Sequence, residues 1–322
     1  QRKGSLLSAV DRTVTAAGSR LLAQRLASPL CDPPAIQRRL DAIGWLIADA
    51  AVRADLRDRL KKAPDLLRAF TRIGLERAGP RDLQAILMSL EAGNAIASLL
   101  SDADLASEPA DSEIAEIRNI LAALPTGLKA TLAAALADEL PLQARDGGFV
   151  RAGHEEGLDE LRTLRDVSRR VIARLQARYC ETVGIKSLKI RHNNVLGYFV
   201  EVSAANAAAL TDKPHCDIFI HRQTLANVMR FTTAELGELE QKIASASDRA
   251  AVIERQIFEQ LCQAVLDEQD GLRAGAAALA AIDVAASGAE LAEAARLTRP
   301  RIDDTLTFNI DGGRHPVVER FM

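Results

Sequence analysis

The sequence predicts a mostly α-helical protein in which two long helices carry a small antiparallel β-sheet. Helices are favoured because hydrophobic residues make up 48% of the 322 residues but aromatic residues only 3%, and the apolar side chains are mostly Ala and Leu. The sheet is predicted because residues 184–232 alternate apolar and polar side chains, whereas the flanking segments repeat apolar residues at helical spacing. A chain of this length can bury a large core, and we expect two or three structural units.

Helical spacing extends from the start of the chain to about residue 140, which predicts a multi-helix core. Prolines place some of the helix ends, since one helix should begin after Pro33-Pro34 and another at Pro80. After this core, the pair Asp146-Gly147 suits a type I′ turn and predicts a small hairpin.

Two long helices are predicted on either side of the β segment. The first covers residues 155–182, and its apolar or small positions recur every 3 or 4 residues, as in a coiled-coil seam. These positions are Leu158, Leu161, Leu164, Ser168, Val171 and Leu175. The second helix repeats the spacing at Leu236, Leu239, Ile243, Ala246, Ala250, Ile253 and Ile257. Because a compact segment joins the helices, we expect them to run antiparallel with Ile243 and Ile253 buried against the first; an ordinary helical bundle is the alternative.

The β segment contains three runs that predict strands. Apolar residues alternate over residues 188–190 and 198–202, and residues 218–225 can add another strand. Asn193 lies between the first two runs, where a tight turn is expected because Asn tolerates left-handed conformations.

This segment is basic within an acidic chain. It contains six Lys or Arg against three Asp or Glu, a net +3, whereas the whole chain carries −3. Any binding of a nucleic acid must therefore come from a local patch. A small basic sheet at the end of two long helices suggests a device that grips a polyanion.

The side chains that we expect to contact the phosphate groups of a polyanion are Asn193, Asn227, Arg230, Lys189, Arg191 and Arg222. Asn227 and Arg230 are expected one helical turn apart, where strand gives way to helix. Amide and guanidinium groups donate to phosphate, and aromatic residues are too sparse to favour the reading of bases, so binding should not depend on sequence. The alternative is that these are solvated polar residues, with Arg230 in a local salt bridge.

Several other patterns in the sequence could suggest an ATP, metal or catalytic site, but none has the residues that such a site needs. Residues 184–187 only look like a phosphate-binding loop, because Lys does not follow Gly and no glycine lies four or five residues earlier, so we expect no ATP site. His215, Cys216 and His221 lack a fourth partner at a zinc-like spacing, so we expect no metal. No catalytic arrangement of side chains has a recognisable context, and we expect no catalytic residue.

The cysteines and the chain ends add two expectations. Four scattered cysteines without a C-x-x-C pair are typical of reduced thiols in a cytosolic protein. No apolar run approaches 18 residues, so no membrane span is expected. The chain starts at Gln1 without Met and stops at Met322 after a strand-like run, as if it were cut from something larger.

Several long stretches resemble the MutS family of DNA mismatch repair proteins. They occur in the family's order, cover nearly the whole chain, and lie at residues 4–22, 79–83, 145–162, 188–203, 221–236 and 313–319. The resemblance implies a mostly α fold: a multi-helix core with a long antiparallel helical lever that carries a small antiparallel β clamp. It also places Asn193, Asn227 and Arg230 at clamp positions that touch the DNA backbone in the family.

The resemblance further implies a division of the chain. Residues 1–183 would be the core and outgoing lever helix, 184–232 the β clamp, 233–297 the returning lever helix and rest of the core, and 298–322 the first strands of a truncated ATPase domain. The family's mismatch-reading and connector domains would precede Gln1, and most of the ATPase would follow Met322. One departure is a clamp loop, residues 203–217, that is longer than the family pattern; we expect a solvated turn there.

By the same resemblance, the clamp grips duplex DNA without specificity, and the levers couple it to the ATPase. Mismatch binding and ATP hydrolysis would belong to the full-length parent, a DNA-dependent ATPase with ATP and magnesium; this fragment would be no enzyme and hold no cofactor. Expected partners are double-stranded DNA, a second copy in a parental homodimer and a downstream mismatch repair factor, in the cytoplasm and without a membrane. The rival interpretation is a structural coiled-coil spacer with a dimerising head and no role in DNA binding.

Overall fold

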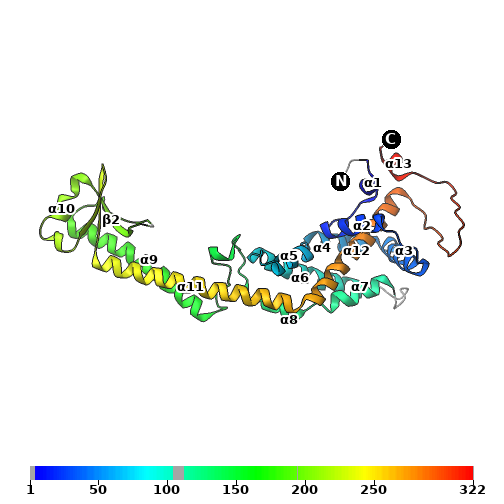
Figure 1. Ribbon diagram of the computed structural model, residues 1–322, viewed down its shortest axis with the longest axis horizontal. Helices are drawn as coiled ribbons and strands as arrows, with labels where there is room; N and C mark the ends of the chain where they lie inside the picture. Colours follow the sequence, from blue (N-terminus) through cyan, green and yellow to red (C-terminus); the bar gives the residue numbers. More distant parts are fainter. Residues whose placement is uncertain (1–3, 104–111, 194, 322) are drawn as a thin grey trace. The chain divides into compact units, whose positions relative to one another are not determined.

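The computed structural model describes residues 4–103, 112–193 and 195–321, which divide into two compact units (Figure 1). The first unit is formed by the described parts of Gln1–Gln143 and Phe258–Met322, and the second by Ala144–Ile257. The described residues are mostly helical and form one small antiparallel sheet, so the predicted fold class is confirmed.

The first unit is helical, and its longest helices, α6 and α12, each pack against several others. Helix α12 contacts α2, α3 and α7, and α6 contacts α4, α5, α7 and α8. The helices are α1 Leu6–Val10, α2 Ala16–Ala27, α3 Pro33–Ala48, α4 Ala50–Lys62, α5 Leu66–Gly74, α6 Pro80–Asp102, α7 Glu113–Ala122, α8 Thr126–Ala135, α12 Gln269–Ala295 and α13 Pro316–Phe321. Helices α3 and α6 begin at the prolines that the sequence analysis singled out.

Leucine and isoleucine side chains fill the core of this unit. Those with no exposed surface include Leu46, Leu56, Leu60, Leu83, Ile86, Leu90 and Ile96. Each such side chain stabilises the folded state by about 1.5–3 kcal/mol relative to an exposed one. By length and composition, α6 and α12 are also apolar enough to cross a membrane, but both are partly buried core helices, which commonly have this character.

A buried carboxylate fixes the start of α2. Asp283 on α12 is fully buried and accepts hydrogen bonds from the backbone N–H of Val14 (3.0 Å) and Thr15 (2.8 Å) and from the Thr15 hydroxyl (2.6 Å). A Cβ atom at Gly18 would overlap this carboxylate, so the glycine permits the close approach. Burial raises the pKa of Asp283, an effect that the hydrogen bonds and the charge of Arg57 oppose.

The four cysteines are free thiols with different environments, and we expect them to differ in reactivity. Burial raises the pKa of Cys262 to about 11, with Asp82 and Glu259 adding to the effect, whereas Cys31 is exposed. Because the thiolate is the reactive species, iodoacetamide at neutral pH should modify Cys262 at least about tenfold more slowly than Cys31. Peptide mass analysis of timed reactions measures both rates; denatured protein is the control, and equal rates in the folded chain would contradict the burial of Cys262.

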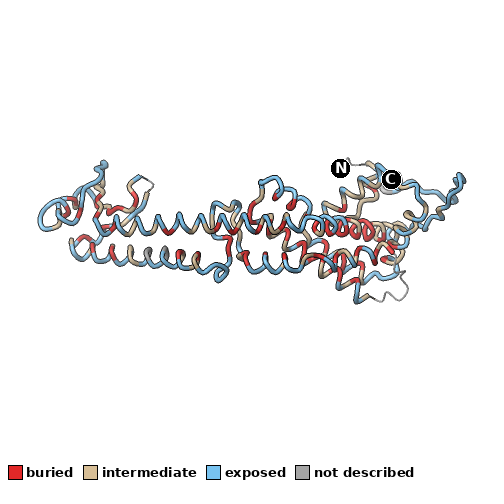
Figure 2. Tube along the Cα trace, turned by 60° about the horizontal axis from the view of Figure 1, so that its bottom comes forward, coloured by how far each residue is buried: buried red, intermediate tan, exposed pale blue. Residues whose placement is uncertain are grey.

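The second unit contains two long antiparallel helices, α9 Glu156–Val183 and most of α11 Ala234–Asp267, which lie side by side (Figures 1 and 2). The direction follows from two ion pairs, since Arg178 pairs with Glu235 near one end and Arg162 with Glu254 near the other. The Tyr179 hydroxyl also lies 2.8 Å from the Thr233 hydroxyl. The predicted antiparallel pairing is therefore confirmed.

The predicted seam between these helices is only partly closed. Its ends are buried, at Leu158, Leu161, Leu175, Leu236 and Ile257, and the small Ala246 is buried in its middle. Contrary to expectation, Ile243 and Ile253 are only half-buried, and 43% of Leu164 is exposed; the Ser168 side chain lies outside the described residues. A groove of about 420 Å³ lies beside Leu164, because small residues such as Ser245 and Ala246 on α11 do not fill the space opposite it.

The hairpin predicted at Asp146-Gly147 does not form. Residues Ala144–Asp146 make a single 3₁₀ turn, η1, and Gly147 and Gly148 follow with φ of +68° and +82°. Glu254 on α11 accepts from the Gly148 N–H at 2.9 and 3.0 Å, which bends the chain toward the helix instead of into a second strand.

Four antiparallel strands make the sheet of the second unit, in the order β1-β2-β4-β3. They are β1 Lys189–Asn193, β2 Gly197–Ser203, β3 Ile220–Thr224 and β4 Val228–Thr232. One face packs on a core that includes Val200 and Phe231 from the sheet, Leu175 and Tyr179 from α9 and Leu236 from α11. The three predicted strands are present; β4 was predicted as the start of a helix, but it pairs on both sides with other strands.

The long loop at residues 203–217 is structured. It forms the short helices η2 Ala204–Asn206, α10 Ala208–Thr211 and η3 His215–Asp217. Ala207 and Leu210 are buried in the sheet's core, so the expectation of a solvated turn is wrong for this part of the loop. Two apolar residues three positions apart on one helical turn are enough to bring it onto the sheet.

The two strands predicted at the end of the chain are absent from the described residues 298–321. The chain is irregular up to α13, and Leu306, Phe308 and Ile310 are exposed. Their alternation fits a strand, but a strand needs a hydrogen-bonded neighbour, and the described residues offer none here.

Candidate nucleic-acid interface

The outer face of the sheet carries the charged side chains, because residues alternate between the two faces of a strand. Glu201 on β2 pairs in register with Lys189 on β1 and with Arg230 on β4. Arg191 lies two residues from Lys189, and Phe199 two from Glu201, so all five share the face opposite Val200 and Phe231. We call these five residues the outer face.

Glu201 connects two of the predicted DNA-binding arginines. One carboxylate oxygen lies 3.1 Å from Arg191 Nε and the other 3.1 Å from Arg230 Nε. The Arg230 guanidinium also donates to Gln223 Oε1 at 2.9 Å and stacks 4.6 Å from the centre of the Phe199 ring. Arg230 is therefore in a local salt bridge, as the alternative interpretation held, but 21% of its side chain and 55% of that of Arg191 remain exposed.

The six predicted residues do not form one cluster. Asn193 ends β1 at one end of β2, and its side-chain oxygen accepts from the N–H groups of Val195 (3.0 Å) and Leu196 (2.7 Å). Asn227 is exposed in the turn between β3 and β4, and its carbonyl oxygen accepts from Ala204, next to the other end of β2. A seven-residue strand separates the two Asn residues by roughly 20 Å.

Arg222 and Lys189 are exposed, and the described residues offer neither a salt bridge. Arg222 lies at the irregularity between His221 and Gln223, where β3 slips in its pairing with β4. Arg230 lies within β4, so it and Asn227 are not one helical turn apart as predicted. The structure thus brings together Lys189, Arg191 and Arg230, and places Asn227 and Arg222 toward the β3–β4 hairpin.

The sequence analysis missed the role of Glu201 and also a contact that fixes the β1–β2 hairpin. Glu240 on α11 accepts from the Tyr198 N–H at 3.2 Å. Gly197, with φ of +67°, lies so close that a Cβ atom would overlap the Glu240 carboxylate. Neither role has a local signal, because both depend on which strand or helix becomes the neighbour.

We expect Gly197→Ala to destabilise the chain by about 0.5–1.5 kcal/mol more than Gly184→Ala, because the Glu240 side chain must move and give up its bond to the Tyr198 N–H. Both glycines have left-handed φ, of +67° and +70°, but an added Cβ meets nothing at Gly184 and the Glu240 carboxylate at Gly197. Chemical denaturation of the two variants isolates the overlap from the backbone strain. Equal losses of stability would show that the hairpin does not depend on its approach to Glu240.

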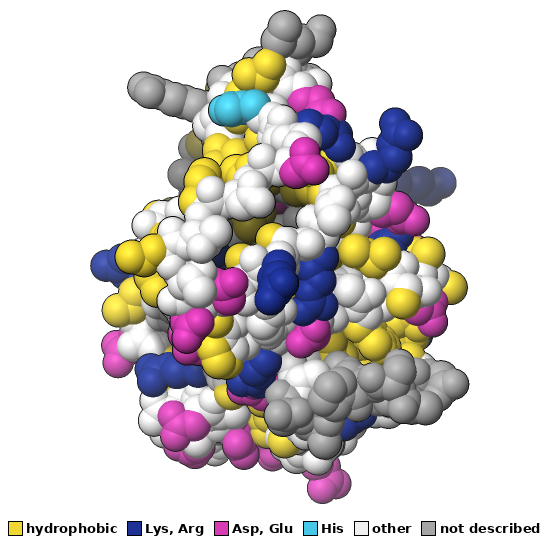
Figure 3. Space-filling model, turned by 90° about the vertical axis from the view of Figure 1, so that its right-hand side faces the viewer, with side chains coloured by type: hydrophobic (Ala, Val, Ile, Leu, Met, Phe, Trp, Pro, Cys, Tyr) yellow, Lys and Arg dark blue, Asp and Glu magenta, His cyan; other side chains and the backbone are white. Residues whose placement is uncertain are grey.

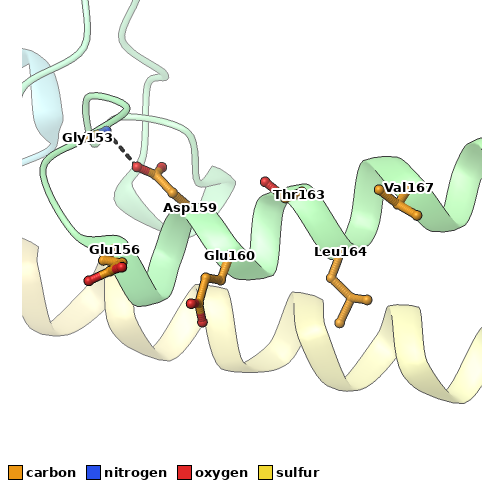
Figure 4. Close-up of a pocket in the computed structure, with 7 residues that line it drawn as sticks. All are labelled: Gly153, Glu156, Asp159, Glu160, Thr163, Leu164 and Val167. Carbon is orange, nitrogen blue, oxygen red and sulfur yellow. Dashed lines mark hydrogen bonds between the residues drawn. The ribbon is translucent and has the colours of Figure 1, made fainter.

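Other surfaces are poor candidates for a polyanion. A cavity of about 720 Å³ on α9 is lined by Glu156, Asp159, Glu160 and Val167, among others, and Asp159 bonds the Gly153 N–H at 2.6 Å (Figure 4). Its carboxylates repel phosphate. On the face of the first unit shown in Figure 3, basic and acidic side chains are interspersed. No group of three or more His, Cys, Asp or Glu in the described part of the chain could hold a metal ion.

The comparison with known proteins decides the family. Residues 1–289 match the family model described as MutS domain III. The DNA mismatch repair protein MutS of Rhizobium meliloti (strain 1021) is 56% identical over 320 residues, which cover 99% of this chain. The chain belongs to the MutS family.

This MutS-family chain spans 34% of the length of that relative. The match to MutS domain III covers α9, α11 and the whole sheet, so the outer face lies inside it. The irregular segment before α13 lies beyond residue 289, outside the matched range.

Proposed function

We propose that this MutS-family chain holds duplex DNA through its clamp, residues 184–232, as part of a DNA mismatch repair protein. The observation that carries the proposal is the outer face, where Lys189, Arg191 and Arg230 come together around a single carboxylate. Exposed ammonium and guanidinium groups bind phosphate, and neutralised phosphates release counterions, which drives association with DNA.

The same face argues for backbone contacts and against base reading. Phe199, which could stack on a base if it were free, is buried and lies beneath the Arg230 guanidinium. We therefore propose that Lys189, Arg191, Arg222 and Arg230 contact phosphates and that Asn227 adds a neutral donor. Asn193 is a weaker contact, because its side-chain oxygen already closes the hairpin turn.

We also propose that α9 and α11 act as lever helices, which carry a change at the clamp to the core. In this proposal residues 1–183 are core and outgoing lever, 233–297 are returning lever and core, and 298–322 begin the ATPase domain. The full-length protein would be a cytoplasmic homodimer and a DNA-dependent ATPase that uses ATP and magnesium and recruits a downstream repair factor. The fragment itself would bind DNA and perform no catalysis.

The test is fluorescence anisotropy of a labelled duplex titrated with the 322-residue chain at several salt concentrations. We expect weak, non-specific affinity of roughly 10⁻⁴ to 10⁻⁶ M at physiological salt. Arg191→Glu and Arg230→Glu should each weaken binding more than Asn227→Ala, because they reverse a charge. Each lost phosphate contact should lower the slope of log affinity against log salt by about 0.9, without changing the preference between matched and mismatched duplex.

A matched control is Arg249→Glu, an exposed charge reversal on α11 outside the sheet, which should bind like the wild type. If both arginine variants on the outer face bind like the wild type at every salt concentration, the sheet is not the DNA contact. The coiled-coil spacer with a dimerising head would then be the better interpretation.

A further inference from the structure

We propose that Glu201 limits the affinity of the clamp for DNA by competing with phosphate for Arg191 and Arg230. The inference rests on the proposed function, because it concerns the same outer face. It names the residue that controls how readily the arginines of this face can bind phosphate. The ligand class is the phosphate backbone of a duplex.

The geometry places Glu201 where it acts on both arginines at once. It sits on β2, between β1 and β4, and each of its carboxylate oxygens lies 3.1 Å from one guanidinium nitrogen. The Glu201 side chain is 14% exposed, less than either arginine, so it lies beneath the surface that a phosphate would approach. A bound phosphate must either take the arginines from this carboxylate or share them with it.

These ion pairs are not needed to hold the sheet together. Val200, Val202 and Phe231 on the other face supply the apolar core of the clamp. Partly exposed ion pairs contribute little to stability, so they can be exchanged for phosphate contacts at low cost. Arg230 also contacts Gln223 and the ring of Phe199, and these two neighbours hold it on the outer face if Glu201 is replaced by a neutral residue.

Removal of the negative charge should therefore strengthen binding. In Glu201→Gln the side chain keeps its size, while the repulsion between its carboxylate and a phosphate is lost. We expect affinity to rise about three- to tenfold at low salt, which is the scale of the interaction between two unit charges about 4 Å apart in bulk water. The gain should shrink as salt is added, because screening weakens interactions between exposed charges.

The structure offers a reciprocal variant. Gln223 flanks Arg230 from β3, opposite Glu201, and its Oε1 accepts from the Arg230 guanidinium. Gln223→Glu would place a second carboxylate against the same arginine, so we expect about three- to tenfold weaker binding at low salt. Glu160→Gln is the matched control, because it removes one exposed carboxylate from α9, outside the sheet, and should leave binding unchanged.

The experiment is anisotropy of a labelled duplex with the wild-type chain and these three variants, at low and high salt, after thermal melts of each. Opposite shifts in Glu201→Gln and Gln223→Glu that fade with salt, with Glu160→Gln unchanged, are the expected result. If the wild type binds and Glu201→Gln binds equally or more weakly, Glu201 positions the arginines instead of competing for them, and the inference is overturned. If Glu201→Gln does not fold, unchanged binding by Gln223→Glu overturns it; if neither the wild type nor any variant binds, the proposed function itself fails.

Discussion

Replacing Asp283 with alanine should lower the free energy of unfolding by about 3–5 kcal/mol. The fully buried carboxylate accepts from the N–H groups of Val14 and Thr15 and from the Thr15 hydroxyl. Its removal leaves these donors without acceptors inside the protein, and α2 loses the group that fixes its start. Urea denaturation followed by circular dichroism measures the loss.

Asp303 provides a matched control for this variant. It accepts from the Thr305 N–H (3.0 Å) and hydroxyl (2.6 Å) in a similar local arrangement, but on the surface, so Asp303→Ala should leave the denaturation midpoint unchanged. A midpoint for Asp283→Ala equal to that of the wild type would contradict the buried cap.

The pH dependence of Asp283 has a definite sign. Burial raises its pKa above the ordinary 3.8, so the folded state binds the proton more tightly than the unfolded state. The part of the folding stability that depends on protonation of Asp283 is therefore fully present below pH 3.8. It is lost as the pH rises through the folded-state pKa. As the pH rises from 3.8 through the folded-state pKa, the difference in unfolding free energy between the wild type and Asp283→Ala should become smaller. A difference that grows with pH would contradict the raised pKa.

The second large effect is expected for Glu254→Ala, which should destabilise the second unit by about 3–5 kcal/mol. Glu254 is buried, accepts from the Gly148 N–H, and pairs with Arg162 at 2.7 Å. Without it, the arginine keeps its charge in a partly buried place and the left-handed Gly147–Gly148 segment loses its attachment to α11. Thermal melts of the variant measure the effect.

A second ion pair between the same two helices makes the comparison direct. Glu235 pairs with Arg178, but about half of each side chain is exposed, so Glu235→Ala should cost less than about 1 kcal/mol. The double variant Arg162→Met/Glu254→Leu should be more stable than Glu254→Ala, because no charge is left unpaired. Equal effects of Glu254→Ala and Glu235→Ala would show that burial does not distinguish the two pairs.

Helices and strands with a signal in their own residues were predictable, whereas β4, which only its neighbours define, was not. Pro33 and Pro80 start helices because a missing N–H costs nothing in the first turn. Strand β4 followed Asn227 directly and led into α11, so its residues looked like the first turn of that helix. Only its pairing with β2 and β3 makes it a strand, and its own five residues do not indicate that pairing.

The candidate site shows the same limit. The charge of the β segment located the basic surface, because a net charge needs only a count of residues. Glu201 entered that count as one acid among three, yet its register between Lys189 and Arg230 makes it the partner of two arginines. Likewise, Ile243 and Ile253 follow the heptad spacing, but the small residues of α11 leave the middle of the seam open.

The bond between Asp283 and Thr15 also dictates an order of events during synthesis. The two residues are 268 positions apart, and the whole second unit is made between them. At typical translation rates, α2 waits roughly 13 to 54 s for α12 to emerge. The strands of the clamp pair with residues less than about fifty positions away in the sequence, so the clamp can fold before α12 is made. The surfaces of α2 and α3 that pack on α12 therefore stay uncovered until α12 is made, and a chaperone would shield them in the meantime.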